Sequence, residues 1–350
     1  MKKAAKEQKT ESQVLYRKYR PQSFDEVVGQ EKIVNALKNA IAKDTTAHAY
    51  LFHGGRGTGK TTIARILAEE FGTSVSDLVE IDAASNRKIE DIRELREGVK
   101  TLPFESKYKV YIIDEVHMLT NESFNALLKT LEEPPAHVKF ILATTELHKI
   151  PQTILSRCEV YTFEEPSHAT LTDRVSDVAK EEGYKISKEN AALIASLGEG
   201  SFRDTLGVLQ KVIASTEGKE ILEATILAAC SMAPKSAVRH FIQAAVTHDK
   251  PAALTAFHQA LEARIDPRLF LEQVLHMMRM GLLLKISKQS EAYIAEHVSK
   301  DDHAFLTTLI TEHAAAFNSV LFTKFLDAYA LAGQSPIPEL AVEMSIDSLS

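Results

Sequence analysis

Short apolar runs alternate with helical patterns between about Ala49 and Phe163. The apolar runs read "AYLF", "VEID", "KVYIID", "VKFILATT" and "VYTF", and helical stretches include Thr61 to Phe71 and Glu122 to Glu133. Strands that alternate with helices in this way are typical of a parallel sheet covered on both faces. The pattern therefore predicts an α/β domain.

The helical pattern is clearest near residue 130. There, Phe124, Leu127, Leu128 and Leu131 recur at i, i+3, i+4 and i+7, which places them on one face of a helix. The two prolines of "EEPPAHVKF" then end this helix, because proline cannot continue one.

Strand signals disappear after "FEEPSHAT". The segments "LTDRVSDVAKEEGY", "SKENAALIASLGEG" and "SFRDTLGVLQKVIAS" predict three helices separated by Gly and Ser, and the pattern stays helical from about Glu220 to the end. We therefore expect an α/β domain at 1–164, a small helical lid domain at 165–220 and an all-helical domain at 221–350.

The composition is ordinary for a folded protein, with 45% hydrophobic and 25% charged residues in a chain of 350. The first residues, "MKKAAKEQKTESQ", lack the apolar stretch of a signal peptide, and no run approaches the roughly 18 apolar residues of a membrane span. We therefore expect a cytoplasmic protein with no membrane contact.

The net charge of −7 disfavours a protein that coats nucleic acid by charge alone. The only cysteines, Cys158 and Cys230, disfavour a disulfide framework or a thiolate zinc site.

The segment "GGRGTGKTT" carries the clearest chemical signal. It fits G-x-x-x-x-G-K-[ST] between a predicted strand and a predicted helix, which is the context of a phosphate loop. Its glycines let backbone N–H groups converge on a phosphate, and the helix N-terminus adds partial positive charge. We expect Lys60 to contact the β- and γ-phosphates and Thr61 to bind Mg²⁺; a glycine-rich turn without a ligand is the alternative. The expected nucleotide-binding residues of the loop are Gly54, Gly55, Arg56, Gly57, Thr58, Gly59, Lys60, Thr61 and Thr62.

Two adjacent acids follow the apolar run "KVYIID". A carboxylate at the end of a strand beside a phosphate loop can hold the magnesium shell, so Asp114 is expected to be a metal ligand together with Thr61. Glu115 is the candidate base that orients or deprotonates the attacking water. Without a phosphate loop upstream, the same pair of acids is usually a solvated strand end. His117 is interpreted as a structural rather than a catalytic histidine.

Two arginines are candidates for charge stabilisation during phosphoryl transfer. An arginine supplied by a second subunit can add about 10³ to 10⁵ in rate. Arg157 in "LSRCEV" precedes the last strand, on the side expected to face a neighbouring subunit, whereas Arg203 in "GSFRDTL" begins a lid helix and can reach a nucleotide in its own chain. By pattern alone, each is read as a surface or salt-bridging arginine.

Several further motifs surround the phosphate loop in a fixed order: "LYRKYRPQSFDEVVGQEKIV", "EIDAASN", "IRELRE", "YIIDEVHMLTNESFNALLKTLEEPP", "FILATTE", "ILSRC" and "GSFRDTL". Together they resemble the bacterial DNA polymerase III gamma/tau family, the AAA+ ATPases of the sliding-clamp loader. The resemblance covers roughly residues 14 to 213 and is weaker in the helical C-terminal part.

The resemblance implies an AAA+ P-loop NTPase fold, followed by a helical lid and a collar domain that assembles a ring. It implies that Thr145 is the first sensor, that Arg157 acts on the ATP of the neighbouring subunit, and that Arg203 is the second sensor. Within the segment from Tyr16 to Gln30 it implies an adenine-side wall, with contacts from Val28 and Gly29.

The resemblance also implies ATP and Mg²⁺ as cofactors. The implied partners are the delta and delta-prime subunits, further gamma/tau copies, a sliding clamp and primed DNA. ATP binding would favour an open clamp and a grip on primed DNA, and hydrolysis would release both. The family is counted with DNA-directed DNA polymerase III, whereas this chain has no polymerase carboxylate constellation of its own.

Two departures from the family pattern stand out. The family commonly carries a four-cysteine zinc module after the phosphate-loop helix, whereas "AEEFGTSVSDLVEID" passes to the next strand without a cysteine. We therefore predict no zinc. The chain also stops at Ser350 without a Pro-rich or charged extension, so we expect the short gamma form, without the helicase-binding and polymerase-binding regions of the longer form.

Three other functions are weighed against this one. A branch-migration or replication-restart AAA+ motor shares the phosphate loop and the lid arginine but fits "SRC" and "EIDAASN" less well. A clamp-loader paralogue that binds nucleotide without turnover would not need both Asp114 and Glu115. The third alternative is a direct DNA-binding role for the helical part. Its lysine-rich segment "KKAAKEQK" is more often a solvated tail.

Overall fold

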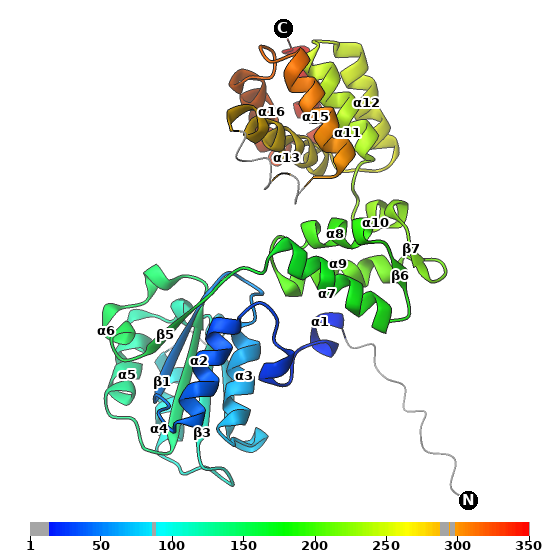
Figure 1. Cartoon of the computed structure of the whole chain (residues 1–350). Coiled ribbons are helices and arrows are strands. Elements are labelled where there is room, and N and C mark those ends of the chain that lie inside the picture. Colours follow the sequence, from blue (N-terminus) through cyan, green and yellow to red (C-terminus); the bar gives the residue numbers. More distant parts are fainter. Residues whose placement is uncertain (1–13, 86–88, 288–293, 295–297, 350) are drawn as a thin grey trace, which may run out of the picture. The chain divides into compact units, whose positions relative to one another are not determined.

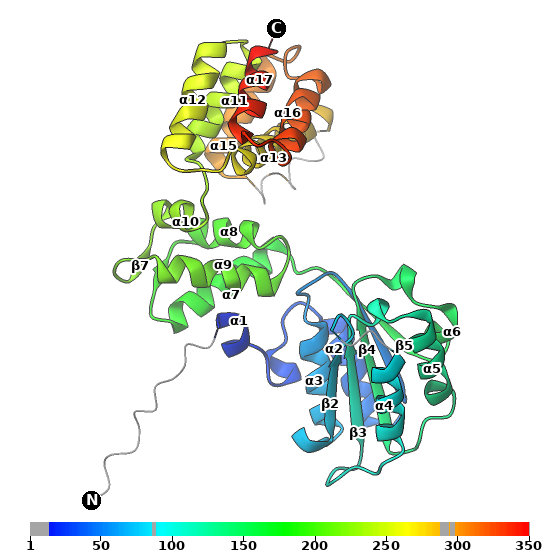
Figure 2. The ribbon, with the colours of Figure 1, turned by 180° about the vertical axis from the view of Figure 1, so that it is seen from behind.

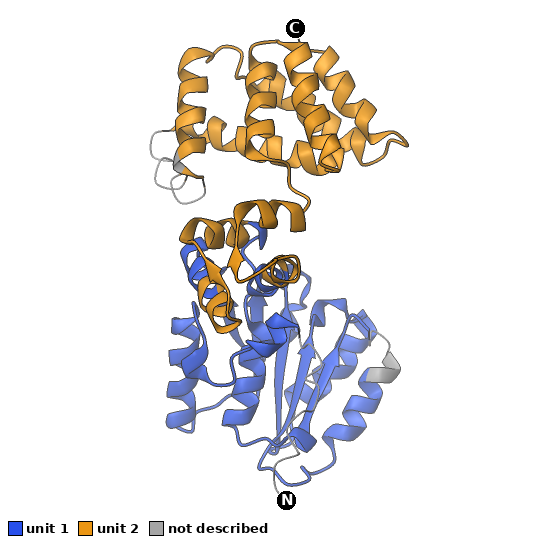
Figure 3. Cartoon of the chain, turned by 90° about the vertical axis from the view of Figure 1, so that its right-hand side faces the viewer, with its two compact units in different colours: residues 1–174, 197–207 blue, residues 175–196, 208–350 orange. Residues whose placement is uncertain are grey.

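The computed structural model describes residues 14–85, 89–287, 294 and 298–349 (Figure 1). The segment 1–13, in which the sequence predicts no signal peptide, lies outside the described residues. The chain forms two compact units (Figure 3): residues 1–174 with 197–207, and residues 175–196 with 208–350. The expected domain boundaries at 164 and 220 stay a prediction.

The first unit is built on a five-stranded parallel sheet with the strand order β2-β3-β4-β1-β5. The strands are β1 (Ala49–Gly54), β2 (Leu78–Asp82), β3 (Lys109–Asp114), β4 (Val138–Thr144) and β5 (Glu159–Phe163). Each contains or overlaps one of the apolar runs of the sequence. The expected α/β fold with a parallel sheet is confirmed.

Side chains of the central strands alternate between two separate cores, one on each face of the sheet. On β1, Tyr50 and Phe52 join one core, whereas Ala49 and Leu51 join the other. Helices α2 and α3 supply the first core, and α4 and α5 supply the second (Figures 1 and 2). Burial on both faces explains why β4 reads as a continuous apolar run in the sequence.

The first unit holds helices α1 (Leu15–Lys18), α2 (Glu31–Ala42), α3 (Lys60–Glu70), α4 (Ile89–Val99), α5 (Asn121–Glu132) and α6 (Gln152–Leu155). Thr120 caps α5, because its side chain accepts a hydrogen bond from the backbone N–H of Ser123. Helices α3 and α5 match the two expected between the strands, and α2 and α4 add to them.

The three helices expected after the sheet are present as α7 (His168–Glu181), α8 (Lys188–Leu197) and α9 (Phe202–Ala214). The expectation that strands end there is wrong in one detail. Two-residue strands β6 (Lys185–Ile186) and β7 (Glu220–Ile221) pair in parallel. Strands this short have no detectable alternation of apolar and polar residues.

The rest of the second unit is helical, as expected. Its helices are α10 (Glu223–Ala229), α11 (Lys235–Val246), α12 (Lys250–Glu262), α13 (Pro267–Ile286), α15 (Lys300–Glu312), α16 (Ser319–Ala332) and α17 (Pro338–Asp347). Helices α11, α12, α13, α15, α16 and α17 contribute to a core that includes the buried side chains of Phe241, Phe257, Phe270, Phe317 and Phe325. Among the residues that the structure describes, no helix is long and apolar enough to cross a membrane.

Candidate active site

The candidate site lies at the carboxyl edge of the sheet in the first unit. Strand β4 lies between β3 and β1, so the three strands end side by side. The phosphate loop follows β1, Asp114 ends β3 and Thr144 ends β4. Segments that are far apart in the sequence therefore meet at the edge where open α/β sheets bind ligands.

The phosphate loop needs glycine at two positions for different reasons. Gly57 has φ +69°, and a Cβ there would lie 1.9 Å from Ser201 Oγ, so the loop packs tightly against the start of α9. Gly59 has φ +102° and caps α3, and a Cβ there would meet no atom within 4 Å. The space beside Gly59 is therefore open at the N-terminus of a helix, where a phosphate group fits.

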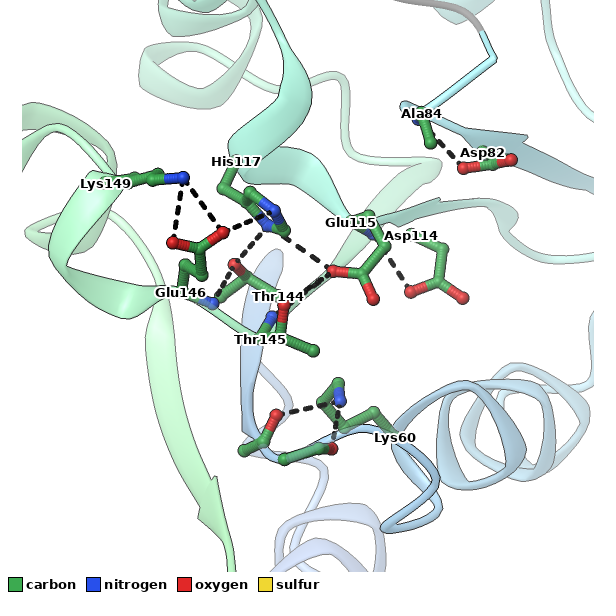
Figure 4. A network of polar contacts seen from close by, with 12 residues as sticks. Lys60, Asp82, Ala84, Asp114, Glu115, His117, Thr144, Thr145, Glu146 and Lys149 are labelled. Atoms are coloured by element: carbon green, nitrogen blue, oxygen red, sulfur yellow. Dashed lines mark hydrogen bonds and ion pairs between the residues drawn. The ribbon is translucent and has the colours of Figure 1, made fainter. Parts of the chain in front are cut away.

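Lys60 is only 5% exposed, and its ammonium points back into the loop. Its Nζ donates to the backbone oxygens of Gly54 at 2.9 Å and Gly55 at 2.7 Å (Figure 4). Burial lowers the pKa of Lys60, and attraction to Glu115 and Asp114 opposes that shift. The site therefore holds one buried cation whose present partners are neutral carbonyl groups.

The two expected magnesium ligands contact each other directly. Thr61 Oγ1 donates to Asp114 Oδ2 at 2.7 Å. The other carboxylate oxygen of Asp114 accepts the backbone N–H of Glu115 at 3.0 Å. A hydroxyl and a carboxylate oxygen are hard ligands of the kind that Mg²⁺ prefers, so the donor set fits this ion.

Glu115 has left-handed backbone angles, with φ +49° and ψ +45°. This conformation is uncommon for a residue other than glycine, and such strain is concentrated at functional sites. Its Oε2 accepts hydrogen bonds from the backbone N–H of Thr145 at 3.3 Å and from Thr145 Oγ1 at 3.2 Å. The candidate base and the expected first sensor are therefore in direct contact (Figure 4).

A pocket opens beside the phosphate loop, lined entirely by residues of the first unit. Lys60, Thr61, Asp114 and Glu115 line it together with the loop residues from Arg56 to Thr62. The rest of its wall comes mainly from the N-terminal segment and the start of α9, with Arg174 from α7; it includes Tyr16, Tyr19, Pro21, Val28, Arg203 and Leu206. The pocket combines the polar groups of the phosphate loop with aromatic, apolar and arginine side chains, which suits a nucleotide with its phosphates on the loop.

Arg203 lies in this pocket, with its guanidinium 5.0 Å from the centre of the Tyr16 ring. Hydrogen bonds from Arg17 and Arg203 lower the pKa of Tyr16. Arg157 does not line the pocket. Its Nη2 forms an ion pair with Glu132 Oε1 at 2.7 Å, and its side chain is 32% exposed.

Only some of the remaining expected residues line the pocket. Val28 lines the pocket, whereas Gly29, Gly54, Gly55 and Thr145 are not among its lining residues. Several residues of the site were not singled out from the sequence. Arg174 and Phe202 line the pocket, and buried Gln30 donates from Nε2 to the backbone oxygen of Glu164 at 2.8 Å. Phe202 and Gln30 lie within the motifs "GSFRDTL" and "LYRKYRPQSFDEVVGQEKIV", but the motifs do not indicate these contacts, because only the folded chain brings the residues to the site.

Comparison with known proteins places this site in a family. The family model described as "DNA polymerase III, delta subunit" matches residues 29–77 and 72–167. The DNA polymerase III subunit tau of Bacillus subtilis is 39% identical over 83% of this chain and 55% of its own length. The DNA polymerase III subunit gamma of Buchnera aphidicola subsp. Baizongia pistaciae is 35% identical over 78% of this chain and 79% of its own length.

The chain belongs to the DNA polymerase III gamma/tau family. The resemblance inferred from its motifs is therefore confirmed. The chain spans about half the length of the tau relatives from Bacillus subtilis and Escherichia coli.

Solved structures support the fold of this gamma/tau relative. RuvB of Thermotoga maritima, a Holliday junction branch migration motor, superposes with a TM-score of 0.53 over 65% of this chain and 78% of its own, at 20% identity. The likeness shows a shared P-loop NTPase fold, which is a nucleotide-binding fold that works with Mg²⁺. In the described ranges no group of three or more His, Cys, Asp or Glu side chains is placed to hold a metal, and the absence of zinc stays a prediction.

Proposed function

We propose that this chain is an ATP-hydrolysing subunit of a clamp loader, which loads a sliding clamp onto primed DNA. The observation that carries the proposal is the convergence of an ammonium, a hydroxyl and two carboxylates at one sheet edge: Lys60, Thr61, Asp114 and Glu115. Membership of the gamma/tau family supports the same role.

Each of these four residues has a separate role in the proposed hydrolysis of ATP. Lys60 contacts the β- and γ-phosphates, while Thr61 and Asp114 hold Mg²⁺, which neutralises phosphate charge when bound. Glu115 orients the attacking water and takes a proton from it. The left-handed backbone of Glu115 and its contact with Thr145 support this assignment.

The two arginines take separate roles. Arg203 acts within its own chain, since it lines the nucleotide pocket. Arg157 acts on the nucleotide of a neighbouring subunit, which agrees with its place outside the pocket.

We propose the delta and delta-prime subunits and further gamma/tau copies as partners in the ring. The sliding clamp and primed DNA are the proposed targets on which the complex acts. A cytoplasmic location follows from this function and stays part of the proposal.

The test is the ATP turnover of the chain assembled with its delta and delta-prime partners. Strong stimulation by a sliding clamp and primed DNA together is expected. Stimulation by a four-way junction instead would identify a branch-migration motor. Tight ATP binding without turnover under every condition would identify a nucleotide-binding scaffold.

A further inference from the structure

His117 has no task in the function proposed above, yet it is 6% exposed and contacts the site directly. It belongs to the 3₁₀ turn Val116–Met118 that follows the two acids. Its Nδ1 lies 3.0 Å from Thr144 Oγ1 and 3.4 Å from Glu115 Oε2. Its Nε2 lies 3.3 Å from Glu146 Oε1 (Figure 4). The ring therefore lies between two carboxylates.

The Glu146 side of the ring is firmly held. The ammonium of Lys149 lies 2.9 Å from one carboxylate oxygen of Glu146 and 2.8 Å from the other. This hydrogen bond from Lys149 lowers the pKa of Glu146. The backbone N–H of Glu146 also donates to Thr144 Oγ1 at 3.0 Å, and Thr144 is fully buried on the central strand β4. Glu146 can therefore act as a fixed anchor for the ring.

The Glu115 side is less constrained. The carboxylate follows three rotatable bonds, and its two hydrogen bonds from Thr145 are longer than the usual 2.9 Å. A candidate base must hold its oxygen within hydrogen-bond reach of the attacking water, and a 1 Å displacement can cost about 100-fold in rate. A rigid ring against Oε2 removes orientations in which the carboxylate turns away.

We propose that His117 is a positioning residue that fixes the orientation of the Glu115 carboxylate, with Glu146 as its anchor. This inference rests on the proposed ATP hydrolysis. A purely structural histidine would affect stability and ATP binding together with turnover. A positioning residue affects turnover while the phosphate loop, which His117 does not touch, keeps its affinity.

Three substitutions separate the two sides of the ring. Asn carries a polar atom at the bond position of Nδ1, Gln carries one at the position of Nε2, and Ala carries neither. In the assembled complex His117→Ala is expected to lower kcat about 10- to 100-fold, with KM and the Kd of a fluorescent ATP analogue changed by no more than about two-fold. His117→Asn keeps the contact with Glu115 but loses the anchor at Glu146, so it is expected to recover kcat only in part, between His117→Ala and the wild type, whereas His117→Gln stays as low as His117→Ala.

His148 supplies the matched control. It also approaches Glu146, at 3.6 Å, but is 76% exposed, so His148→Ala should turn over ATP at the wild-type rate. A wild-type kcat in His117→Ala would overturn the inference, as would a parallel loss of kcat and ATP affinity in all three His117 variants. An absence of turnover in the wild-type complex would instead overturn the proposed function.

Discussion

At the residue scale, Lys60 has to exchange its present hydrogen-bond partners when a nucleotide binds. Its ammonium is satisfied by the carbonyls of Gly54 and Gly55, so a triphosphate must replace these contacts with charged oxygens. A phosphate oxygen carries negative charge, so it attracts the ammonium more strongly than a neutral carbonyl oxygen does.

We therefore expect Lys60→Ala to weaken ATP binding by at least about ten-fold, since hydrogen bonds to charged groups contribute about 1.5–3 kcal/mol. Titration with a fluorescent ATP analogue measures this. Lys32→Ala, at an exposed ion pair with Glu164, is the control and should bind normally. Unchanged affinity in Lys60→Ala would refute the phosphate-loop assignment.

The contact between Thr61 and Asp114 leads to a prediction on magnesium. Thr61→Val keeps the size of the side chain but removes the hydroxyl. If the hydroxyl binds Mg²⁺, the variant should bind ATP more weakly than the wild type in Mg²⁺ and equally well in EDTA. Equal deficits in both buffers would mean that Thr61 acts only by supporting the loop.

The sequence can assign candidate roles to these residues because their signal is local, and those roles stay a prediction. Four of them lie in two contiguous motifs, "GKT" and "DE", whose spacing alone indicates their chemistry. The contact between His117 and Glu146 is different. It depends on β3 and β4 ending side by side, which no spacing in the sequence specifies.

At the element scale, the elements that the sequence identified are those with a long, regular pattern. Helix α5 has an apolar face of several turns, and β4 is buried along its whole length. Strands β6 and β7 were missed because two residues cannot show a period. Their pairing depends on the fold that brings residues 185 and 220 together.

The close packing of the phosphate loop on the start of α9 leads to a prediction about stability. Both Gly57→Ala and Gly59→Ala force alanine into a positive φ, at about 1–2 kcal/mol. Only Gly57→Ala also places a methyl group against Ser201. The Tm of the nucleotide-free protein should therefore fall further in Gly57→Ala than in Gly59→Ala, as thermal unfolding measures. Equal losses of Tm would mean that the loop relaxes away from Ser201.

A buried carboxylate joins two loops outside the candidate site. Asp77 is 1% exposed and accepts the backbone N–H groups of Phe104, Glu105 and Ser106. Burial opposes the ionisation of Asp77, but these donors outweigh it and hold its pKa well below the ordinary value. The stabilisation is therefore present above the unfolded pKa of about 3.9 and is lost as the pH falls below it.

Asp77→Asn should consequently have a lower Tm than the wild type at pH 7, and the gap should narrow as the pH falls from 5 towards 2. Calorimetry at several pH values measures it. Asp25→Asn is the control, because Asp25 forms an exposed ion pair with Lys38 and should produce little gap at any pH. A gap that stays constant with pH would contradict the role of the ionised carboxylate.

At the scale of the whole molecule, helix α9 has a property that its sequence pattern does not predict. Its residues up to Gly207 belong to the first compact unit and the later ones to the second. The reason lies at its start, where the backbone N–H of Phe202 donates to the carbonyl of Gly57 in the phosphate loop at 3.2 Å. A regular helical period predicts the helix but not which compact unit each end belongs to.

Assembly decides the role of Arg157. If this residue completes the site of a neighbouring subunit, Arg157→Ala should leave ATP binding by the isolated chain unchanged and lower turnover in the assembled complex by about 10³-fold or more. Arg203→Ala should differ by weakening ATP binding in the isolated chain, because Arg203 lines the pocket of its own chain. Fluorescent-analogue titration and steady-state turnover measure the two effects separately.

The ion pair with Glu132 supplies the control for Arg157. Glu132→Gln releases the guanidinium without removing it, so turnover in the complex should stay at or above the wild-type rate. If Glu132→Gln instead lost as much turnover as Arg157→Ala, the ion pair itself would be the essential feature. The assignment of Arg157 to the neighbouring nucleotide would then be wrong, because an arginine needed only to hold Glu132 acts within its own chain.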